Sequence, residues 1–166
     1  MVDKKLVVPL ISILIGIVLV SIIFYLGLVQ TPPEKENNSG EINFKRIIDG
    51  TQNSIIEKQT IIIRSQNEWL KLWREMFPDQ ITVSSTNFDE QTIVAFFQGE
   101  KPTGGYSINV EKITNQVFYV EIAVKEISPG ENCFLTQALT QPYSIISMPR
   151  TDKEIKFSFK QEIISC

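Results

Sequence analysis

Few side chains in this sequence could carry chemistry, and their spacing does not gather them into a reactive site. The chain of 166 residues has no histidine, which removes Ser–His and Cys–His nucleophilic pairs and the imidazole ligands of most metal sites. Asp89 and Glu90 are adjacent, but neighbours in an extended chain face opposite ways. No serine stands in a G-x-S-x-G context. We therefore expect no enzyme activity, no catalytic residues, no metal, no cofactor and no small-molecule ligand.

A glycine-rich segment, G-E-K-P-T-G-G from Gly99 to Gly105, is the strongest loop signal in the chain. It does not fit a phosphate-binding loop, because no Lys-Ser/Thr follows and the next element looks like a strand. One interpretation is a hairpin turn whose glycines supply positive φ and after which Tyr106 packs inward. The other is a partner-binding loop, because a hairpin needs only about two to five loop residues and Pro102 stiffens this longer segment. The residues of the predicted partner-binding loop are Glu100, Lys101, Pro102, Thr103, Gly104, Gly105 and Tyr106.

Cys133 and Cys166 are the only two cysteines of the chain. One follows a turn signal and the other ends the last predicted strand, so a bridge between them would hold that strand in place. We predict a Cys133–Cys166 disulfide, which an extracytoplasmic location permits. Closing a loop of about 34 residues stabilises a fold by roughly 3–4 kcal/mol in the chain-entropy model. The alternative is two free thiols.

The glycine-rich segment directly follows the strand around which the other elements are predicted to assemble. Five apolar residues in a row, Ile93 to Phe97, predict a strand buried on both faces. Upstream, Ser65 and Glu68 form an S-x-x-E capping box that begins a helix, and Pro78 ends it. The helix carries one apolar stripe, formed by Trp69, Leu72, Trp73 and Met76, which predicts a face packed on a sheet.

The remaining pattern consists of short strands. Candidates lie at Ile42–Ile48 and Ile55–Arg64, separated by an Asp49-Gly50 turn signal, and, after a polar connection at Ile81–Asp89, at Tyr106–Glu111, Phe118–Val124, Leu135–Met148 and Ile155–Lys160. Pro142 marks its segment as an edge strand, a bulge or two pieces. One helix and about seven strands predict the α+β class, a mostly antiparallel sheet arranged as a sandwich or half-barrel with one packed amphipathic helix.

The N-terminus has the composition of a membrane anchor. Residues Leu6 to Val29 contain no charge, and a helix of that length spans roughly 36 Å, enough to cross about 30 Å of hydrocarbon. A cleaved signal peptide is the alternative, although its apolar region is usually shorter. Lys4 and Lys5 precede the span, which predicts a cytoplasmic N-terminus and a domain outside the cell.

This topology divides the chain into a tail at 1–5, a transmembrane signal anchor at 6–29, a linker at 30–41 and an extracytoplasmic domain at 42–166. The linker contains an N-x-S sequon at Asn37. Without residues 1–5, 14 Lys+Arg (16 minus 2) and 18 Asp+Glu (19 minus 1) leave a net charge of −4. With no block of basic residues, a nucleic-acid partner is not expected.

Several of these elements together resemble the PrcB C-terminal domain family. The resemblance rests on E-W-x-x-x-W in the helix, on G-x-x-x-T-G-G-Y from Gly99 to Tyr106, and on T-x-P-Y from Thr140 to Tyr143. It covers roughly Ile61 to Arg150. The family is named for a subunit of a surface protease complex, so the resemblance implies association with a protease and carries over no catalytic residue.

A shorter segment, Lys101 to Tyr106, is similar to the N-P-T-T-G-Y loop of chagasin-type cysteine-protease inhibitors, with Lys in place of Asn and Gly in place of the second Thr. That resemblance implies a loop offered to the cleft of a peptidase. We expect a membrane-anchored accessory or regulatory subunit that binds a protease or protease complex. The alternatives are an envelope protein-interaction domain without a protease partner and a chagasin-like inhibitor.

Overall fold

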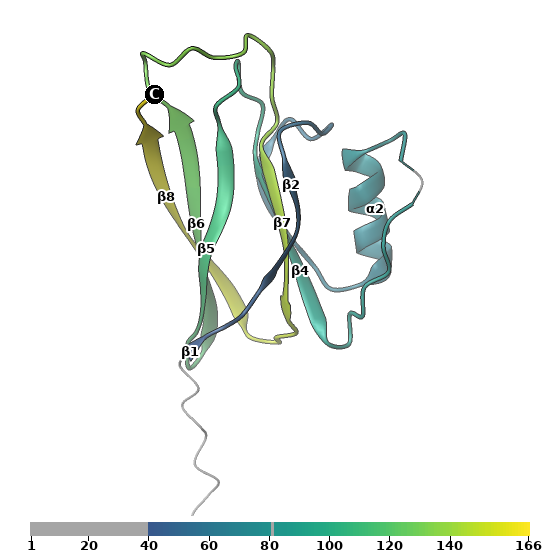
Figure 1. Cartoon of the computed structure of the whole chain (residues 1–166). Helices are drawn as coiled ribbons and strands as arrows, with labels where there is room; N and C mark the ends of the chain where they lie inside the picture. Colours follow the sequence, from purple (N-terminus) through teal and green to yellow (C-terminus); the bar gives the residue numbers. More distant parts are fainter. Residues whose placement is uncertain (1–39, 81) are drawn as a thin grey trace, which may run out of the picture. The chain divides into compact units, whose positions relative to one another are not determined.

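The computed structural model describes residues 40–80 and 82–166 (Figure 1). The tail, the apolar span, most of the predicted linker and the sequon at Asn37 lie outside the described residues. Within residues 40–80 and 82–166, no helix is long and apolar enough to cross a membrane.

Two four-stranded sheets face each other as a sandwich (Figure 1). The order of strands is β1-β5-β6-β8 in the first sheet, here called sheet A, and β2-β7-β4-β3 in the second, sheet B. The strands are β1 Gly40–Glu41, β2 Lys45–Gly50, β3 Lys58–Ile63, β4 Gln91–Gln98, β5 Ser107–Asn115, β6 Tyr119–Pro129, β7 Tyr143–Pro149 and β8 Glu154–Ile164. This confirms the α+β class and the mostly antiparallel pairing.

The predicted central strand is β4, which pairs with β3 on one side and β7 on the other. All of its residues except Gln91 are buried. Val94 and Phe96 point into the core between the two sheets, whereas Ile93, Ala95 and Phe97 pack in the core under the helix. The unbroken apolar run is therefore explained by burial on both faces, as the sequence predicts.

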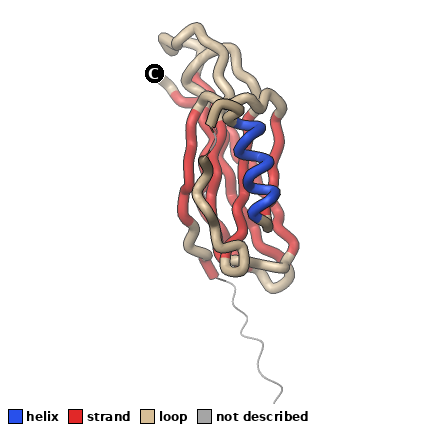
Figure 2. The backbone as a smooth tube through the Cα atoms, turned by 90° about the vertical axis from the view of Figure 1, so that its right-hand side faces the viewer, coloured by secondary structure: helices blue, strands red, loops and turns tan. Residues whose placement is uncertain are grey.

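The helix α2, Gln66–Met76, covers the face of sheet B that points away from sheet A (Figure 2). Ser65 caps it by accepting a hydrogen bond from the Glu68 amide at 3.3 Å. The Glu68 carboxylate in turn accepts a hydrogen bond from the Arg64 amide at 2.8 Å. In the standard capping box the donor is the amide of the capping residue itself, one position later. Its predicted apolar stripe packs on the sheet, with Trp69, Leu72 and Met76 buried and Trp73 partly buried.

The glycine-rich segment is not a hairpin. It joins β4 of sheet B to β5 of sheet A, and β4 and β5 do not pair. Facing sheets lie about 10 Å apart, so a connection between them needs more residues than a tight turn. The length of the segment therefore has a structural reason, and length alone does not indicate a binding role.

Two further strand predictions are wrong in detail. Asp49 and Gly50 belong to the end of β2, where Gly50 lies opposite Tyr143. A Cβ at Gly50 would lie 2.9 Å from the Tyr143 hydroxyl, so this glycine allows a close approach and does not make a turn. The strand expected at Leu135–Met148 is confined to β7, with Pro142 directly before it, and β7 is an inner strand of sheet B.

The last strand, β8, runs parallel to its neighbour β6, whereas the other pairs are antiparallel. Its end is tied to the chain just after β6 by the disulfide between Cys133 and Cys166, whose Cα atoms are 5.2 Å apart. This confirms the predicted bridge. The alternative, two free thiols, is excluded because neither cysteine is free.

Candidate partner-binding loop

Two long connections and the disulfide meet at one end of the sandwich, the upper end in Figure 1. We call this region the loop end and define it as residues 99–106, residues 130–142 and the Cys133–Cys166 bridge. β1 begins at the opposite end of the sheets, beside the β5–β6 turn. The predicted partner-binding loop forms the first of the two connections.

Hydrogen bonds hold the loop against the second connection. Lys101 and Thr140 exchange backbone hydrogen bonds at 2.8 and 3.0 Å. The Thr140 hydroxyl donates to the Thr103 carbonyl at 2.8 Å, and the Gly104 amide donates to the Thr136 carbonyl at 3.0 Å. The T-G-G-Y and T-x-P-Y motifs, far apart in the sequence, therefore contact each other, and the loop is fixed by its neighbour.

Glycine is required at two positions of the loop. Gly99 and Gly105 have φ of 78° and 88°, where other residues are strained. A Cβ at Gly105 would also lie 2.9 Å from Leu135 Cδ2 and 3.1 Å from Pro129 Cβ. Gly104 has neither restriction, because its φ is not positive and a Cβ would meet Thr136 Cβ at an ordinary 3.6 Å.

The side chains of the predicted loop differ in exposure. Glu100 and Pro102 are exposed, as is Gly105, and the other four residues are partly buried. The Glu100 carboxylate accepts a hydrogen bond from the Gln141 amide at 3.2 Å. The Lys101 ammonium lies 5.6 Å from the centroid of the Tyr106 ring, a cation–π contact at the base of the loop. The loop thus presents charge on a fixed backbone.

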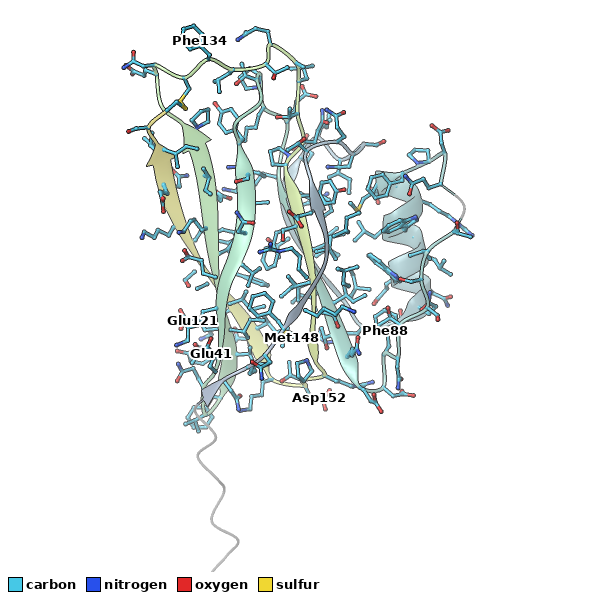
Figure 3. All side chains as sticks on the ribbon, in the orientation of Figure 1. Glu41, Phe88, Glu121, Phe134, Met148 and Asp152 are labelled. Atoms are coloured by element: carbon cyan, nitrogen blue, oxygen red, sulfur yellow. A yellow bond between two sulfur atoms is a disulfide. The ribbon has the colours of Figure 1, made fainter. Side chains whose placement is uncertain are left out.

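Large apolar side chains stand exposed beside this loop, in the second connection. Phe134 is fully exposed and Leu139 is 57% exposed, and Figure 3 shows Phe134 at the outer limit of the loop end. A second exposed pair, Val117 and Phe118, lies in the β5–β6 turn at the opposite end of the sandwich. Exposed aromatic residues are typical of contact surfaces.

An ion pair with a buried carboxylate and a half-exposed lysine lies directly below the loop end, between the two sheets. Glu126 of β6 is 3% exposed, and its two carboxylate oxygens lie 2.7 and 2.8 Å from the Lys58 ammonium of β3. Gln98, the last residue of β4, donates to the Ile127 carbonyl at 3.4 Å, while its buried amide oxygen has no donor among the described residues. This group ties sheet B to sheet A where the glycine-rich segment begins.

A hollow of about 830 Å³ lies away from the loop end, between the start of β2, the segment before β4 and the end of β7. Its lining includes Met148, and Figure 3 shows Met148 in the lower half of the sandwich. Ser147 donates to the Gln91 amide oxygen at 2.7 Å beside the hollow. Lys45 and Glu90 are the charged residues of the lining, and the other lining residues are Asn43, Phe44, Ile47, Ser84, Ser85, Thr86, Asn87 and Pro149.

Neither region gathers groups for reaction chemistry. Among the described residues, no set of three or more acidic, cysteine or histidine side chains is placed to hold a metal ion. Burial, with a smaller contribution from the charge of Asp49, raises the pKa of the Tyr143 hydroxyl above its ordinary value. Tyr143 lies under the helix, stacked on Phe97 and in edge contact with Phe77. The raised pKa thus belongs to packing in the core.

The sequence indicates where the exposed loop lies, but it does not indicate which residues hold the loop in position. The residues that hold it, Thr136 and Thr140, stand in a segment that was expected to be a strand. The burial of Glu126 is predictable from the sequence, because Val120, Ile122 and Val124 face inward at every second position and Glu126 is the next position in that series. Its partner Lys58 lies on a different sheet and left no local signal.

Comparison with known proteins bears on the same part of the chain. The PrcB C-terminal family model matches residues 92–149, which run from β4 through the loop end to the last residue of β7. The match confirms the resemblance seen in the sequence. No curated protein and no solved structure matches the chain.

Proposed function

We propose that this chain, whose residues 92–149 match the PrcB C-terminal family, is a membrane-anchored, extracytoplasmic, non-catalytic subunit that binds a protease or protease complex. The family description supports a link to a protease complex. The anchor and the orientation rest on the uncharged stretch from Leu6 to Val29 and on Lys4 and Lys5. The contact with the protease is assigned to the loop end.

The observation that carries this assignment is the fixed position of an exposed loop. Lys101, Thr103 and Gly104 are hydrogen-bonded to Thr140 and Thr136, while Glu100 and Pro102 remain exposed. A loop that is already ordered loses little conformational entropy on binding, so its contacts contribute more fully to affinity. The exposed Phe134 and Leu139 add apolar area beside it.

Site-specific photocrosslinking in the membranes of the source cells tests the proposal. A benzophenone amino acid is placed at Phe134 and, as a matched control, at Phe118, which is 85% exposed at the opposite end. Both changes replace one exposed aromatic ring by another, so both leave the core intact. We expect a covalent adduct with a peptidase from position 134 and none from position 118.

A second comparison tests the charged residues of the loop. Glu100→Ala and Lys101→Ala remove partly or fully exposed side chains, which changes the free energy of unfolding by about 0.5 kcal/mol or less. Together they should reduce the yield of the peptidase adduct from position 134. Adducts with envelope proteins alone would support the alternative of an interaction domain without a protease partner. Equal adducts at both positions would overturn the assignment to the loop end.

A further inference from the structure

Strand β8 forms an edge of sheet A, with β6 as its one neighbour in the sheet. The direction of its backbone groups follows from one bond at its end. The Gly130 amide donates to the Ile164 carbonyl at 2.9 Å, so Ile164 points its backbone groups toward β6. Because these directions alternate along a strand, the even-numbered residues bond to β6. The amides and carbonyls of the odd-numbered residues, from Ile155 to Ile163, point away from the sheet.

The upper half of β8 also exposes apolar side chains. Phe159 is 45% exposed and Ile163 is 74% exposed, although both lie on the side of the strand that faces sheet B. Lower in the same strand, Ile155 is 9% exposed and Phe157 packs against the core. A long edge with free backbone groups and exposed apolar side chains is a template for a further strand.

The sequence of β8, E-I-K-F-S-F-K-Q-E-I-I, is complementary to itself when two copies run antiparallel about Phe159. Lys156 of each copy then stands opposite Glu162 of the other, and Ile155 stands opposite Ile163. Ser158 faces Lys160, Phe157 faces Gln161, and the two Phe159 rings meet at the centre. Opposite charges and apolar pairs in directly opposed positions stabilise a strand pair.

The free backbone groups fit the same register. The pairs 155–163, 157–161 and 159–159 join odd-numbered residues, whose amides and carbonyls point outward, so each is a hydrogen-bonded pair. The pairs that carry the charges, Lys156 with Glu162, are non-hydrogen-bonded positions, where side chains approach most closely. Five hydrogen-bonded pairs would form about ten backbone hydrogen bonds.

Neighbouring registers place like charges opposite each other. A shift of two residues in one direction brings Lys156 opposite Lys160 and Glu154 opposite Glu162. A shift of two in the other direction brings Lys160 opposite the Lys160 of the second copy. A shift of one residue points the free backbone groups the wrong way, and larger shifts shorten the pairing. The lysines of β8 therefore disfavour the shifted registers, and the register centred on Phe159 is the favoured one.

We infer that two copies of this chain form a symmetric dimer in which their β8 strands pair antiparallel about Phe159 and join both A sheets into one eight-stranded sheet. The pairing is isologous and uses up both free β8 edges, so it closes at two copies. It covers Phe159 and Ile163, the exposed apolar side chains of the upper half of β8. The inference does not depend on a protease partner.

Charge reversal at the edge provides the first test, with the full chain in density-matched detergent and its mass measured by sedimentation. Lys156→Glu places like charges opposite each other twice and should weaken dimerisation by about tenfold or more. Lys156→Glu with Glu162→Lys restores opposite charges between the copies and should recover most of the dimer that Lys156→Glu loses. Glu162→Lys alone is measured beside it, because this change also removes the ion pair that Glu162 makes with Lys125 at 3.1 Å in its own copy. Lys112→Glu, at an exposed lysine of β5, is the control and should leave the dimer unchanged. A monomeric native chain, or a dimer indifferent to Lys156→Glu, overturns the inference.

Disulfide trapping identifies the interface itself. The two native cysteines are bonded to each other, so Phe159→Cys introduces the one free thiol of the chain. It pairs with its own copy at the symmetry centre, where opposed Cα atoms lie about 5.5 Å apart, within reach of a disulfide. We expect a covalent dimer from Phe159→Cys and none from Phe118→Cys. Equal trapping at both positions would show that any dimer forms through another surface.

Discussion

The ion pair between Lys58 and Glu126 gives the sharpest prediction about stability, because its two partners differ in exposure. The Glu126 side chain is 4% exposed, whereas the Lys58 side chain is 54% exposed. Lys58→Met keeps most of the length and apolar contact of the stem but removes the ammonium. The carboxylate then remains between the sheets without its charged partner.

The size of the effect follows from that asymmetry. Removing one partner of a fully buried ion pair costs about 3–5 kcal/mol of folding free energy. Because Lys58 is half exposed, water can approach the carboxylate from its side, so we expect about 2–3 kcal/mol. Loss of the ammonium 5.5 Å from the Phe159 ring centroid adds about 0.5 kcal/mol.

Glu126→Gln leaves the charge of Lys58 without a partner, and this charge can reach water. The half-exposed Lys58 can turn toward water, so the cost should be about 1 kcal/mol. Lys58→Met with Glu126→Gln leaves no buried charge and should be more stable than Lys58→Met alone. The coupling between the two sites should therefore be about 1.5–2 kcal/mol.

Urea unfolding followed by tryptophan fluorescence measures these differences, since Trp69, on the face of α2 that packs on sheet B, is completely buried. The urea midpoints should shift while the slope stays constant. A loss below about 0.5 kcal/mol in Lys58→Met would refute the reasoning, because it falls within the range of ordinary surface substitutions. Strict additivity in the double variant would refute it as well.

Four further outcomes are expected. Cys133→Ser should lower the free energy of unfolding by roughly 3–4 kcal/mol, measured against the oxidised chain in urea, and a loss under 1 kcal/mol would contradict the loop-entropy estimate. Gly105→Ala should cost about 1–3 kcal/mol because its φ of 88° is strained for alanine, while Gly104→Ala, where a Cβ finds ordinary contacts, should change the urea midpoint little. The raised pKa of Tyr143 means that the unfolded chain loses this proton first, so stability should fall as pH rises above the ordinary value of 10.0. Tyr143→Phe should remove that part of the decline, and an unchanged pH profile would count against it. Protease added to intact cells should release the sandwich domain, and resistance until the cells are opened would reverse the predicted orientation.

Local patterns in the sequence predict much of this fold. The capping box and apolar stripe of α2, the doubly buried β4 and the alternation in β5, β6 and β8 are set by residues close in sequence. The assignment of strands to sheets is not local. Nothing near Gly99 tells whether β4 pairs with β5 or passes it to the other sheet. Likewise, nothing in β8 indicates that it joins β6 in the parallel direction.

The candidate site shows the same division. The glycines, Pro102 and the charged residues of the loop are recognisable because loops need such residues. The hydrogen bonds from Thr140 and Thr136 could not be predicted, since they depend on how the second connection folds back across the loop end. The disulfide was predictable for a simpler reason, because two cysteines allow one pairing within the chain.

The position of β4 between β3 and β7 also determines when each of its two partners becomes available during synthesis of the chain. Its first partner, β3, has already been made, but β7 begins 45 positions after β4 ends, from Gln98 to Tyr143 (143 minus 98). At about 5–20 residues per second, synthesis of that stretch takes roughly 2–9 s, whereas hairpins form in about 1–10 μs. For those seconds one edge of the most apolar strand has no partner. β2 waits for the same partner, because β7 is its one neighbour in sheet B. Slow synthesis between Gln98 and Tyr143 is therefore expected to prolong the exposure of both strands and to lower the yield of folded protein.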